Sequence, residues 1–410
     1  MIDNTLHPSK RPFLSTAIFF LCCWYLLLCA VNYTRQRPLW LDEISVFKSV
    51  STYQPQDFFT KKLAVDQIFP RFYLFLIQKI SQPFDFSLLA VRFFSFVAMI
   101  AAFLVWFKVA GQELAPKASE ARAKLEDNLQ YFTFVLCWVA SAPLVYYSAE
   151  LKQYSMDVLA SGLFVWFLYN QKSLAKNKAQ YLTILTLLPL LGLFSYPAFL
   201  FFIFPVYNLL MEKPKEKGHW LALALFCVSA LFAVAFVYFF DIRITKANVH
   251  TQGFMDYSVS FQSVGAFFKT FGEGTMNLFS RWFAERPRFI KRIAVFFLMC
   301  GLIYMVYGFF RSFRKNKYFN VADNLAFPIY IELFILGCLG KYPFSVTRTS
   351  LFFCPLIFIA TIKGIAELKR IHPYLYKVAH ALFLTFLTFV AIGIARVVLT
   401  QDFSFSPKIW

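Results

Sequence analysis

Long apolar runs separated by short polar loops dominate the pattern of this sequence. Runs of membrane-spanning length recur from Phe13 to Leu399. In lipid, backbone groups must form their hydrogen bonds within the segment, so these runs are predicted to be helices. The alternating apolar and polar positions of an outer-membrane barrel are not seen. The pattern therefore predicts an all-α polytopic membrane protein.

About eleven transmembrane helices are predicted, and they form one integral-membrane domain, 1–410, with no soluble C-terminal domain. The first run follows Lys10 and Arg11, and its length and the lack of a clear small-residue cleavage site favour a retained anchor over a signal peptide. The predicted spans are 13–31, 88–110, 130–147, 156–170, 180–194, 198–211, 220–240, 291–310, 325–340, 351–365 and 379–399.

The charges of the loops predict the orientation. The segment 68–84 is apolar but short, and it contains Arg71, Gln78 and Lys79. If this segment does not cross the membrane, every short basic loop falls on the inner side, as the positive-inside rule requires. We therefore predict that 68–84 is an amphipathic helix in the outer interface. The predicted outer loops are then 32–87, 148–155, 195–197, 241–290 and 341–350.

Composition agrees with this class and narrows the function. The chain has 59% hydrophobic residues, 55 Phe and a mean hydropathy of +0.57. Its net charge of +19 is explained by basic inner loops, so no nucleic-acid partner is predicted. The 8 cysteines lie in apolar runs without a CxxC pair, which argues against a zinc site or a disulfide framework. No glycine-rich phosphate loop is present to bind a nucleotide-linked substrate.

Two acidic sites fall on the predicted outer side of the membrane. Asp42 and Glu43 begin the first long outer loop, and Glu150 lies in the loop 148–155. Only 15% of the residues are charged, so adjacent carboxylates at a fixed depth are candidates for general-base chemistry. A helix that begins here places Glu150 on one face with Gln153, Tyr154 and Asp157. This face could line a cavity that opens outward.

These acids also have ordinary structural explanations. Asp42 and Glu43 could simply end a helix at the headgroups, with Trp40 as an interfacial aromatic residue. Glu150 could pair with Lys152, and an acid at a helix start such as Asp157 is favoured by the helix dipole. The residues alone leave both explanations open.

Other polar residues in or near the spans are further candidates. Arg348 is predicted at the mouth of a membrane cavity, where its planar fork suits a phosphate, although it could also snorkel from a helix end. Tyr196 lies in a tight outer turn. Glu332 is predicted in mid-span, where a carboxylate is usually paired or functional, and Arg92 or Arg396 could be its partner.

Three motifs in order give the chain a resemblance to a known superfamily. They are Trp40-Leu41-Asp42-Glu43 after the first helix, Tyr146-Tyr147-Ser148-Ala149-Glu150-Leu151-Lys152-Gln153-Tyr154 in the second outer loop, and Tyr342-Pro343-Phe344 followed by Arg348 and Pro355. In this order and approximate spacing, over most of the chain, the sequence resembles the GT-C integral-membrane glycosyltransferases. The nearest branch looks like the bacterial family-39-type enzymes, relatives of protein O-mannosyltransferases and lipid A aminoarabinose transferases.

The resemblance implies a fold, a reaction and a location. The fold is a GT-C helical bundle with an outward cavity and juxtamembrane helices in the first outer loop. The reaction transfers a sugar from a polyprenyl-phosphate-type carrier to a glycan, lipid or protein acceptor, with inversion. The implied location is the bacterial cytoplasmic membrane, with the active site facing outside among membrane lipids. Two departures are the absence of a histidine near Ser195-Tyr196-Pro197 and of the soluble C-terminal domain of some relatives.

The implied roles can be written for individual residues. Asp42 is the expected general base, and Arg348, with Lys152, is expected to stabilise charge on the leaving phosphate. Glu43 and Glu150 would orient hydroxyl groups or hold a divalent metal. No essential metal is expected; if Mg²⁺ or Mn²⁺ is used, Asp42 and Glu150 are the expected ligands. The remaining residues expected to bind substrate are Gln153, Tyr154, Tyr196 and Tyr342.

Competing interpretations belong to other classes of protein. A transporter or flippase of lipid-linked sugars would share the basic inner loops, but it should carry charged residues along a path across the membrane. An O-antigen-ligase-like enzyme would use arginine and histidine in a late outer loop, and 241–290 contains His250, Arg281, Arg286 and Arg288. A non-catalytic scaffold would make the outer acids dispensable.

Overall fold

The computed structural model describes residues 11–63, 69–114, 121–211, 217–245, 258–280, 282–283, 288–315, 318–319, 322–344 and 348–400, which contain helices and no strand. The α-helices are α1 (Arg11–Thr34), α2 (Leu41–Thr52), α3 (Asp57–Thr60), α4 (Arg71–Ser81), α5 (Leu88–Leu114), α6 (Ala121–Val139), α7 (Ala142–Tyr146), α8 (Tyr154–Leu174), α9 (Lys178–Leu187), α10 (Ile203–Met211), α11 (Lys217–Phe236), α12 (Arg243–Thr245), α14 (Val264–Ser280), α15 (Arg288–Lys315), α16 (Ala322–Cys338), α17 (Cys354–Ile371) and α18 (Pro373–Thr400). Five 3₁₀ segments are η1 (Gln82–Phe84), η2 (Tyr147–Ala149), η3 (Leu188–Leu193), η4 (Tyr196–Phe201) and η6 (Leu351–Phe353), and η5 (Val237–Ile242) is a π-helix.

Within the described residues, six helical segments are long and apolar enough to cross a membrane. A seventh results if the pair Asn128–Val139 and Ala142–Ala149, bent by 59°, counts as one span. The predicted all-helical class is confirmed, together with helices of the length that an integral membrane protein requires. The six segments are Leu14–Thr34, Leu88–Leu114, Gly218–Ile242, Arg292–Arg314, Leu351–Ile371 and Pro373–Thr400.

The count of eleven spans stays a prediction, because the other five predicted segments are short, bent or less apolar. Helices occupy all of them, but prolines interrupt several. The segments 180–194 and 198–211 each combine an α-helix with a 3₁₀ segment that has a proline near its start. A 3₁₀ segment rises more per residue, so Lys178–Leu193 reaches about 27 Å, close to the ~30 Å of a bilayer core.

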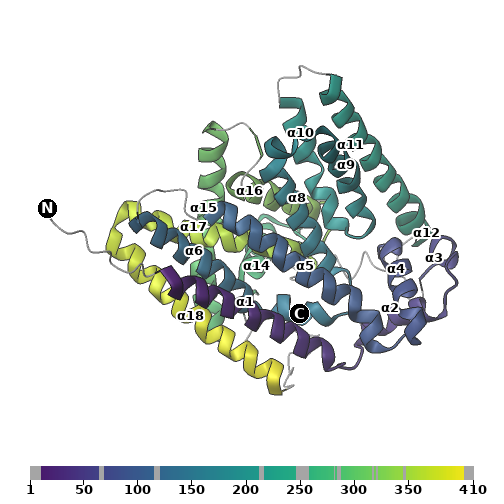
Figure 1. Ribbon diagram of the computed structural model, residues 1–410, viewed down its shortest axis with the longest axis horizontal. Helices are drawn as coiled ribbons and strands as arrows, with labels where there is room; N and C mark the ends of the chain where they lie inside the picture. The colour runs from purple at the N-terminus through teal and green to yellow at the C-terminus, as the bar shows by residue number, and fades with distance from the viewer. Residues whose placement is uncertain are drawn as a thin grey trace.

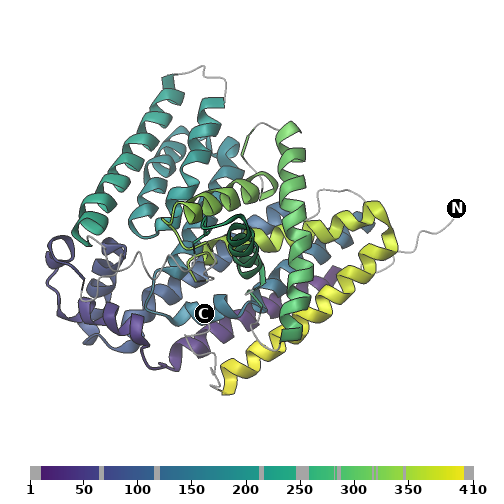
Figure 2. The ribbon, with the colours of Figure 1, turned by 180° about the vertical axis from the view of Figure 1, so that it is seen from behind.

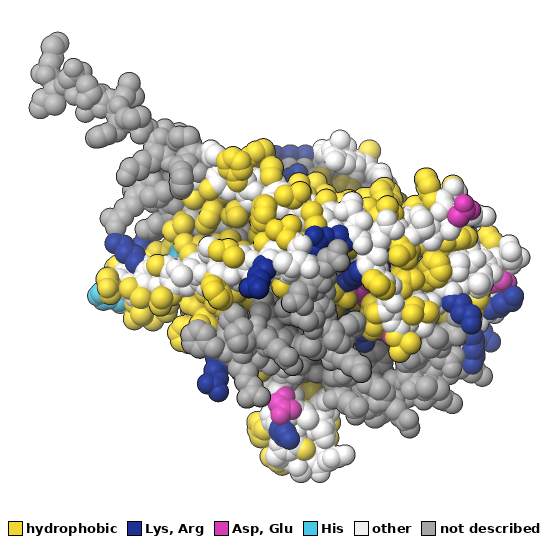
Figure 3. Space-filling model, turned by 90° about the horizontal axis from the view of Figure 1, so that it is seen from below, with side chains coloured by type: hydrophobic (Ala, Val, Ile, Leu, Met, Phe, Trp, Pro, Cys, Tyr) yellow, Lys and Arg dark blue, Asp and Glu magenta, His cyan; other side chains and the backbone are white. Residues whose placement is uncertain are grey.

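Exposed apolar side chains on the outer helices fit a lipid environment. Seen from behind, α15 (green) and α18 (yellow) form the outermost layer (Figure 2). Apolar side chains also cover much of the described surface in Figure 3. Patches of this extent are unusual on soluble monomers. Exposed examples are Phe19 and Phe20 on α1, Leu231 on α11, Phe296 and Ile303 on α15, and Phe389 and Ile392 on α18.

Three short helices, α2, α3 and α4, gather at one end of the bundle beside the start of α5 and the end of α11 (Figure 1). The helix predicted within 68–84 is therefore present as α4. Of the three polar residues noted in this segment, Lys79 is exposed, whereas Arg71 and Gln78 are not. Arg71 and Gln78 are buried, and they donate to the carbonyl ends of α3 and α2, at Phe58 (2.6 Å) and Val50 (3.0 Å). They are buried because helix ends leave unpaired carbonyls that need donors.

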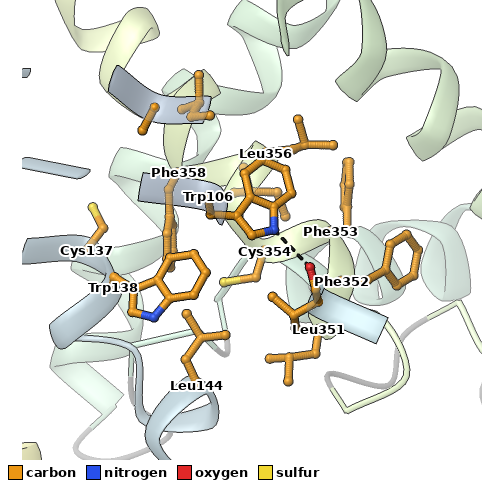
Figure 4. Packing of buried hydrophobic residues seen from close by; sticks show 14 of the residues in the cluster. Trp106, Cys137, Trp138, Leu144, Leu351, Phe352, Phe353, Cys354, Leu356 and Phe358 are labelled. Carbon is orange, nitrogen blue, oxygen red and sulfur yellow. Dashed lines mark hydrogen bonds between the residues drawn. The ribbon is translucent and has the colours of Figure 1, made fainter. Parts of the chain in front are cut away.

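The middle of the bundle is filled by aromatic side chains. Trp106, Trp138 and Phe352 are fully buried there together with Cys354 (Figure 4). The Trp106 indole donates to the Val158 carbonyl at 3.0 Å, which ties α5 to α8.

Close approach of α5 and α8 requires a small residue. A Cβ at Gly162 would lie 2.8 Å from the Trp106 indole nitrogen. The contact between α5 and α8 fixes the relative position of the two segments that carry candidate acids, which precede these helices.

A cluster of charged side chains around Lys363 lies at the C-terminal end of α5. Lys363 on α17 bonds Glu113 of α5 and lies 2.8 Å from Asp323 of α16. Glu113 follows Arg92 by 21 residues along one helix, which separates them by about 30 Å. The buried Trp106 lies between these two positions along α5.

Candidate functional site

Asp42 and Glu43 occupy the first turn of α2, which begins at Leu41. Free backbone N–H groups at a helix start favour acidic side chains there. Because successive residues of a helix point about 100° apart, the side chains of Asp42 and Glu43 face different surroundings. The Asp42 side chain is 27% exposed, whereas that of Glu43 is 0% exposed. The pair therefore divides into one accessible and one buried carboxylate.

Glu43 is held on all sides by fixed donors. Arg92 of α5 binds it in bidentate fashion, from Nε to Oε1 at 3.1 Å and from Nη2 to Oε2 at 2.9 Å. The backbone N–H of Leu151 donates to Oε1 at 2.7 Å, and that of Trp40 to Oε2 at 3.4 Å. Glu43 thus joins the start of α2, helix α5 and the loop before α8.

Asp42 faces two cations instead. Its Oδ2 accepts a hydrogen bond from Arg348 Nη1 at 3.1 Å and lies 3.9 Å from Lys152 Nζ. Both Asp42 and Arg348 remain about a quarter exposed, at 27% and 26%. Three segments that are distant in the sequence therefore bring one accessible carboxylate, one guanidinium and one amine together.

Glu150 is buried next to the group formed by Asp42, Arg348 and Lys152. Its Oε1 accepts a hydrogen bond from the Trp40 indole at 3.1 Å, and its Oε2 lies 3.8 Å from Arg37 Nη2. Burial, with a smaller effect from Glu43, raises the pKa of Glu150 to about 7, against the opposing effects of Arg37 and Lys152. A carboxyl group with this pKa changes its charge near neutral pH.

Trp40 connects the two acidic sites. Its indole binds Glu150, and its ring lies against the Arg348 guanidinium, whose carbon is 5.5 Å from the ring centroid. Such cation–π contacts orient an arginine without neutralising it. Trp40 therefore lies between Glu150 and the cation that contacts Asp42.

Lys152 lies between two acids. Its amine is 3.9 Å from Asp42 and also attracts Glu150, which contacts Trp40 and Arg37. Burial lowers the pKa of the Lys152 amine, although Asp42 and Glu150 act in the opposite direction. The Lys152 carbonyl accepts from the Tyr73 hydroxyl at 2.8 Å, which fixes the loop before α8 against α4.

The four other predicted substrate-binding residues have distinct surroundings. Tyr154 is buried at the start of α8, edge-on to the ring of Tyr147, and Gln153 precedes it. Tyr342 donates to the Thr349 carbonyl at 2.5 Å, which closes the loop that carries Arg348. Tyr196 donates to Asp241 at 2.8 Å and so belongs to a second polar network, in which Asp241 lies 3.8 Å from Arg71.

Sequence reasoning missed Arg37 and Arg92 as members of this site. Arg37 packs over the Tyr146 ring at 3.6 Å and donates to the Ala149 carbonyl at 3.3 Å. A signal was present, because Arg35 and Arg37 form a basic pair on the predicted outer side, where such residues are depleted. Arg92 was visible as a charge within an otherwise apolar helix start.

Glu332 is not paired as predicted. Arg92 binds Glu43, so its assignment to Glu332 is wrong, and Arg396 is exposed on α18. Glu332 Oε2 is buried without a hydrogen bond. The residue lines an apolar cavity of about 230 Å³ together with Phe199, Leu200, Ile203, Ile335 and Leu336.

The raised pKa of Glu150 predicts a pH dependence of stability. From about pH 4.5 to 7, Glu150 keeps a proton in the folded protein that it has lost in the unfolded chain. The folded state therefore loses stability as the pH rises through this window, by on the order of 3 kcal/mol. In Glu150→Gln this contribution should be missing. Thermal unfolding midpoints measured from pH 4.5 to 8 check this, and parallel curves for the two proteins would contradict it.

Searches for similar proteins returned no matching family model, curated protein or solved structure. The resemblance to the GT-C enzymes therefore stays a prediction. Within the described residues, no group of three or more His, Cys, Asp or Glu side chains is placed to hold a metal ion. The use of a metal through Asp42 and Glu150 stays untested. The function has to be argued from the Asp42 site itself.

Proposed function

We propose that this protein is a membrane glycosyltransferase that moves a sugar from a polyprenyl-phosphate-type carrier to a hydroxyl acceptor. The observation that carries the proposal is the accessible Asp42 carboxylate in contact with Arg348 and Lys152. A base and a phosphate-binding cation are the two groups that inverting transfer from a phosphate carrier requires. The resemblance of the motifs to the GT-C enzymes supports the same reaction.

In the proposed reaction, Asp42 accepts the proton of the acceptor hydroxyl while that oxygen attacks the anomeric carbon. The bond between this carbon and the phosphate oxygen breaks on the opposite face of the sugar, so the product is inverted. Both electrons of the broken bond stay with the phosphate, whose negative charge Arg348 and Lys152 stabilise. A general base has to be within hydrogen-bond reach of the proton that it accepts, and Asp42 is the accessible carboxylate of this site.

The contact between Asp42 and Arg348 gives the donor phosphate a defined role. Arg348 donates to Asp42 at 3.1 Å. A bound phosphate offers a more charged partner for the same guanidinium. Arg348 would then turn to the phosphate and free Asp42 for the acceptor hydroxyl, while Trp40 supports the arginine in either position.

The proposed location is the outer face of a bacterial cytoplasmic membrane. The basic loops favour this orientation through the positive-inside rule. A donor with a lipid tail could reach Asp42 from the bilayer, and a glycan, lipid or protein acceptor could approach from outside. The GT-C bundle and its eleven spans belong to this proposal.

The role of Arg348 gives a kinetic prediction. Arg348→Ala is expected to lower kcat/KM for the lipid-linked donor by about 10²–10³-fold, because the leaving phosphate loses its charged donor. Lys341→Ala, at an exposed position of the same segment, is the control and should leave transfer unchanged. Initial rates at several donor concentrations check this. An unchanged dependence on donor concentration would remove Arg348 from phosphate binding.

The packing of the bundle favours an enzyme over a flippase. A path for a sugar headgroup should be lined by polar side chains across the membrane. In the described residues, the core of the bundle holds the fully buried Trp106, Trp138 and Phe352 (Figure 4), and Trp106 lies on α5 between Arg92 and Glu113. For the ligase alternative, His250, Arg281 and Arg286 lie outside the described residues.

A deletion experiment tests the proposed function. Cells that lack this protein should lose one sugar from an envelope glycolipid or glycoprotein, as seen by mass spectrometry. The wild-type protein should restore this sugar, and Asp42→Asn should not. An intact sugar pattern without the protein would contradict the proposal. Restoration by Asp42→Asn would favour the flippase, the ligase or the scaffold.

A further inference from the structure

Several buried polar atoms near the start of α8 lack hydrogen-bond partners. They are Asp157 Oδ1, Gln153 Oε1 and the hydroxyl oxygen of Ser195. Asp157 is 2% exposed and Ser195 is 0% exposed. Buried polar groups are almost always hydrogen-bonded, so an unpaired set of this kind needs an explanation. A ligand that supplies the missing donors is one.

These atoms lie together. Gln153 and Asp157 are four residues apart at the start of α8 and so share one face. The Ser195 hydroxyl, which precedes η4, lies beside the Asp157 carboxylate, although the two form no hydrogen bond of normal geometry. Two separate segments therefore direct unpaired polar atoms at one place.

This place adjoins the Asp42 site. Tyr154, one helical turn before Asp157, lies within electrostatic range of Arg348, Asp42 and Asp157. Tyr342, which closes the Arg348 loop, lies within range of Asp157 and Tyr154. Asp157 is thus a neighbour of the proposed phosphate-binding group without contacting Asp42 directly.

The chemistry of the unpaired atoms limits what they can bind. A carboxylate oxygen and an amide oxygen accept hydrogen bonds, and a serine hydroxyl both accepts and donates. Such a set offers no cation to a phosphate and nothing to a hydrocarbon chain. It suits a compound with several adjacent hydroxyl groups.

We propose that Asp157, Gln153 and Ser195 form the subsite that accepts hydrogen bonds from the hydroxyl groups of the transferred sugar. This inference rests on the proposed function. The sugar lies next to its phosphate in the donor, as this subsite lies next to Arg348. Asp157 would then decide which sugars are transferred, since an unpaired buried acceptor rejects a sugar that lacks the matching hydroxyl.

Replacing Asp157 with Asn is expected to stabilise the protein without ligand and to weaken its binding of the sugar-linked donor. Without ligand, Asp157→Asn should raise the thermal midpoint by about 2–4 °C, because burying an ionisable carboxyl group without a hydrogen-bond partner costs more than burying a neutral amide. Asp241→Asn is the matched control. Asp241 is equally buried but is bonded by Tyr196 and lies near Arg71, so its replacement should lower the midpoint.

Binding is tested separately from turnover. The probes are undecaprenyl phosphate and the same lipid linked to glucose or mannose, added to the Asp42→Asn protein in nanodiscs. The sugar-linked lipid should bind at least about tenfold more tightly than undecaprenyl phosphate alone, and Asp157→Asn should remove this difference. In the protein with Asp42 intact, Asp157→Asn should raise KM for the donor by about 10–100-fold.

The outcomes separate this inference from the proposed function. If sugar-linked lipid binds and is transferred but Asp157→Asn changes neither affinity nor KM, the subsite is wrong and the transferase stands. If neither lipid binds, or Asp157→Asn lowers the thermal midpoint as Asp241→Asn does, the subsite is also wrong. If the sugar adds affinity through Asp157 but Asp42→Asn still transfers it, the subsite stands and the Asp42 mechanism fails.

Discussion

Asp42→Asn is expected to lower the rate of sugar transfer by about 10²–10⁴-fold while the protein remains folded and inserted. Asparagine keeps the shape of the side chain but cannot accept the acceptor's proton. Its amide oxygen can still accept from Arg348, which contacts Asp42 at 3.1 Å, so the local structure should persist. Transfer rates of the purified protein in lipid, with the thermal midpoint measured in parallel, check this.

The matched control is the same change at an acid outside the site. Asp85 lies in the same predicted outer segment, is exposed and has a positive φ of 49°, a conformation that asparagine also tolerates. Asp85→Asn should therefore leave both transfer and stability unchanged. Near-normal transfer by Asp42→Asn would assign the general base to another residue.

Apolar patterning predicted the helical class well and the details of the short helices poorly. Runs such as 88–110 and 379–399 are continuous helices, because no proline interrupts them. The run 130–147 is bent by 59° where α7 begins, with Pro143 in its first turn. Hydropathy does not show such a bend, because both halves remain apolar.

The orientation of α4 shows a second limit. The polar residues of this segment supported an amphipathic helix in the interface, yet Arg71 and Gln78 are buried against the ends of α3 and α2, and Lys79 is exposed. A hydrophobic pattern treats every polar residue as exposed. It cannot foresee that a long polar side chain will be used to satisfy carbonyl groups of another helix.

Asp42, Lys152 and Arg348 were predicted as members of the candidate site, whereas Arg37, Arg92 and the pairings of the charged groups were not. Asp42 and Arg348 were placed on one face of the membrane by loop charge alone, although 306 residues separate them. Which cation meets which acid depends on side-chain directions within the folded bundle. Glu43 was expected to act on substrate, and its enclosure by Arg92 and Leu151 leads us to propose a positioning role instead.

This positioning role predicts a large loss of stability. Glu43→Ala is expected to destabilise the protein by about 3–5 kcal/mol, because Arg92, 1% exposed, would keep an uncompensated buried charge. The segment that carries Asp42 would lose its bond to α5 at the same time. Unfolding in detergent, followed by denaturant titration, measures the effect.

The loss of stability on removing an acid should depend on how deeply the ion pair is buried and on the charged partner that is left behind. Glu367→Ala removes a partially exposed partner of Arg311 and should cost at most about 1 kcal/mol. Combining Glu43→Met with Arg92→Leu should recover most of the loss, because apolar residues can replace a buried pair. If Glu43→Ala costs no more than Glu367→Ala, Glu43 does not hold α2 in place. Its carboxylate would then be free to act on the substrate, beside Asp42.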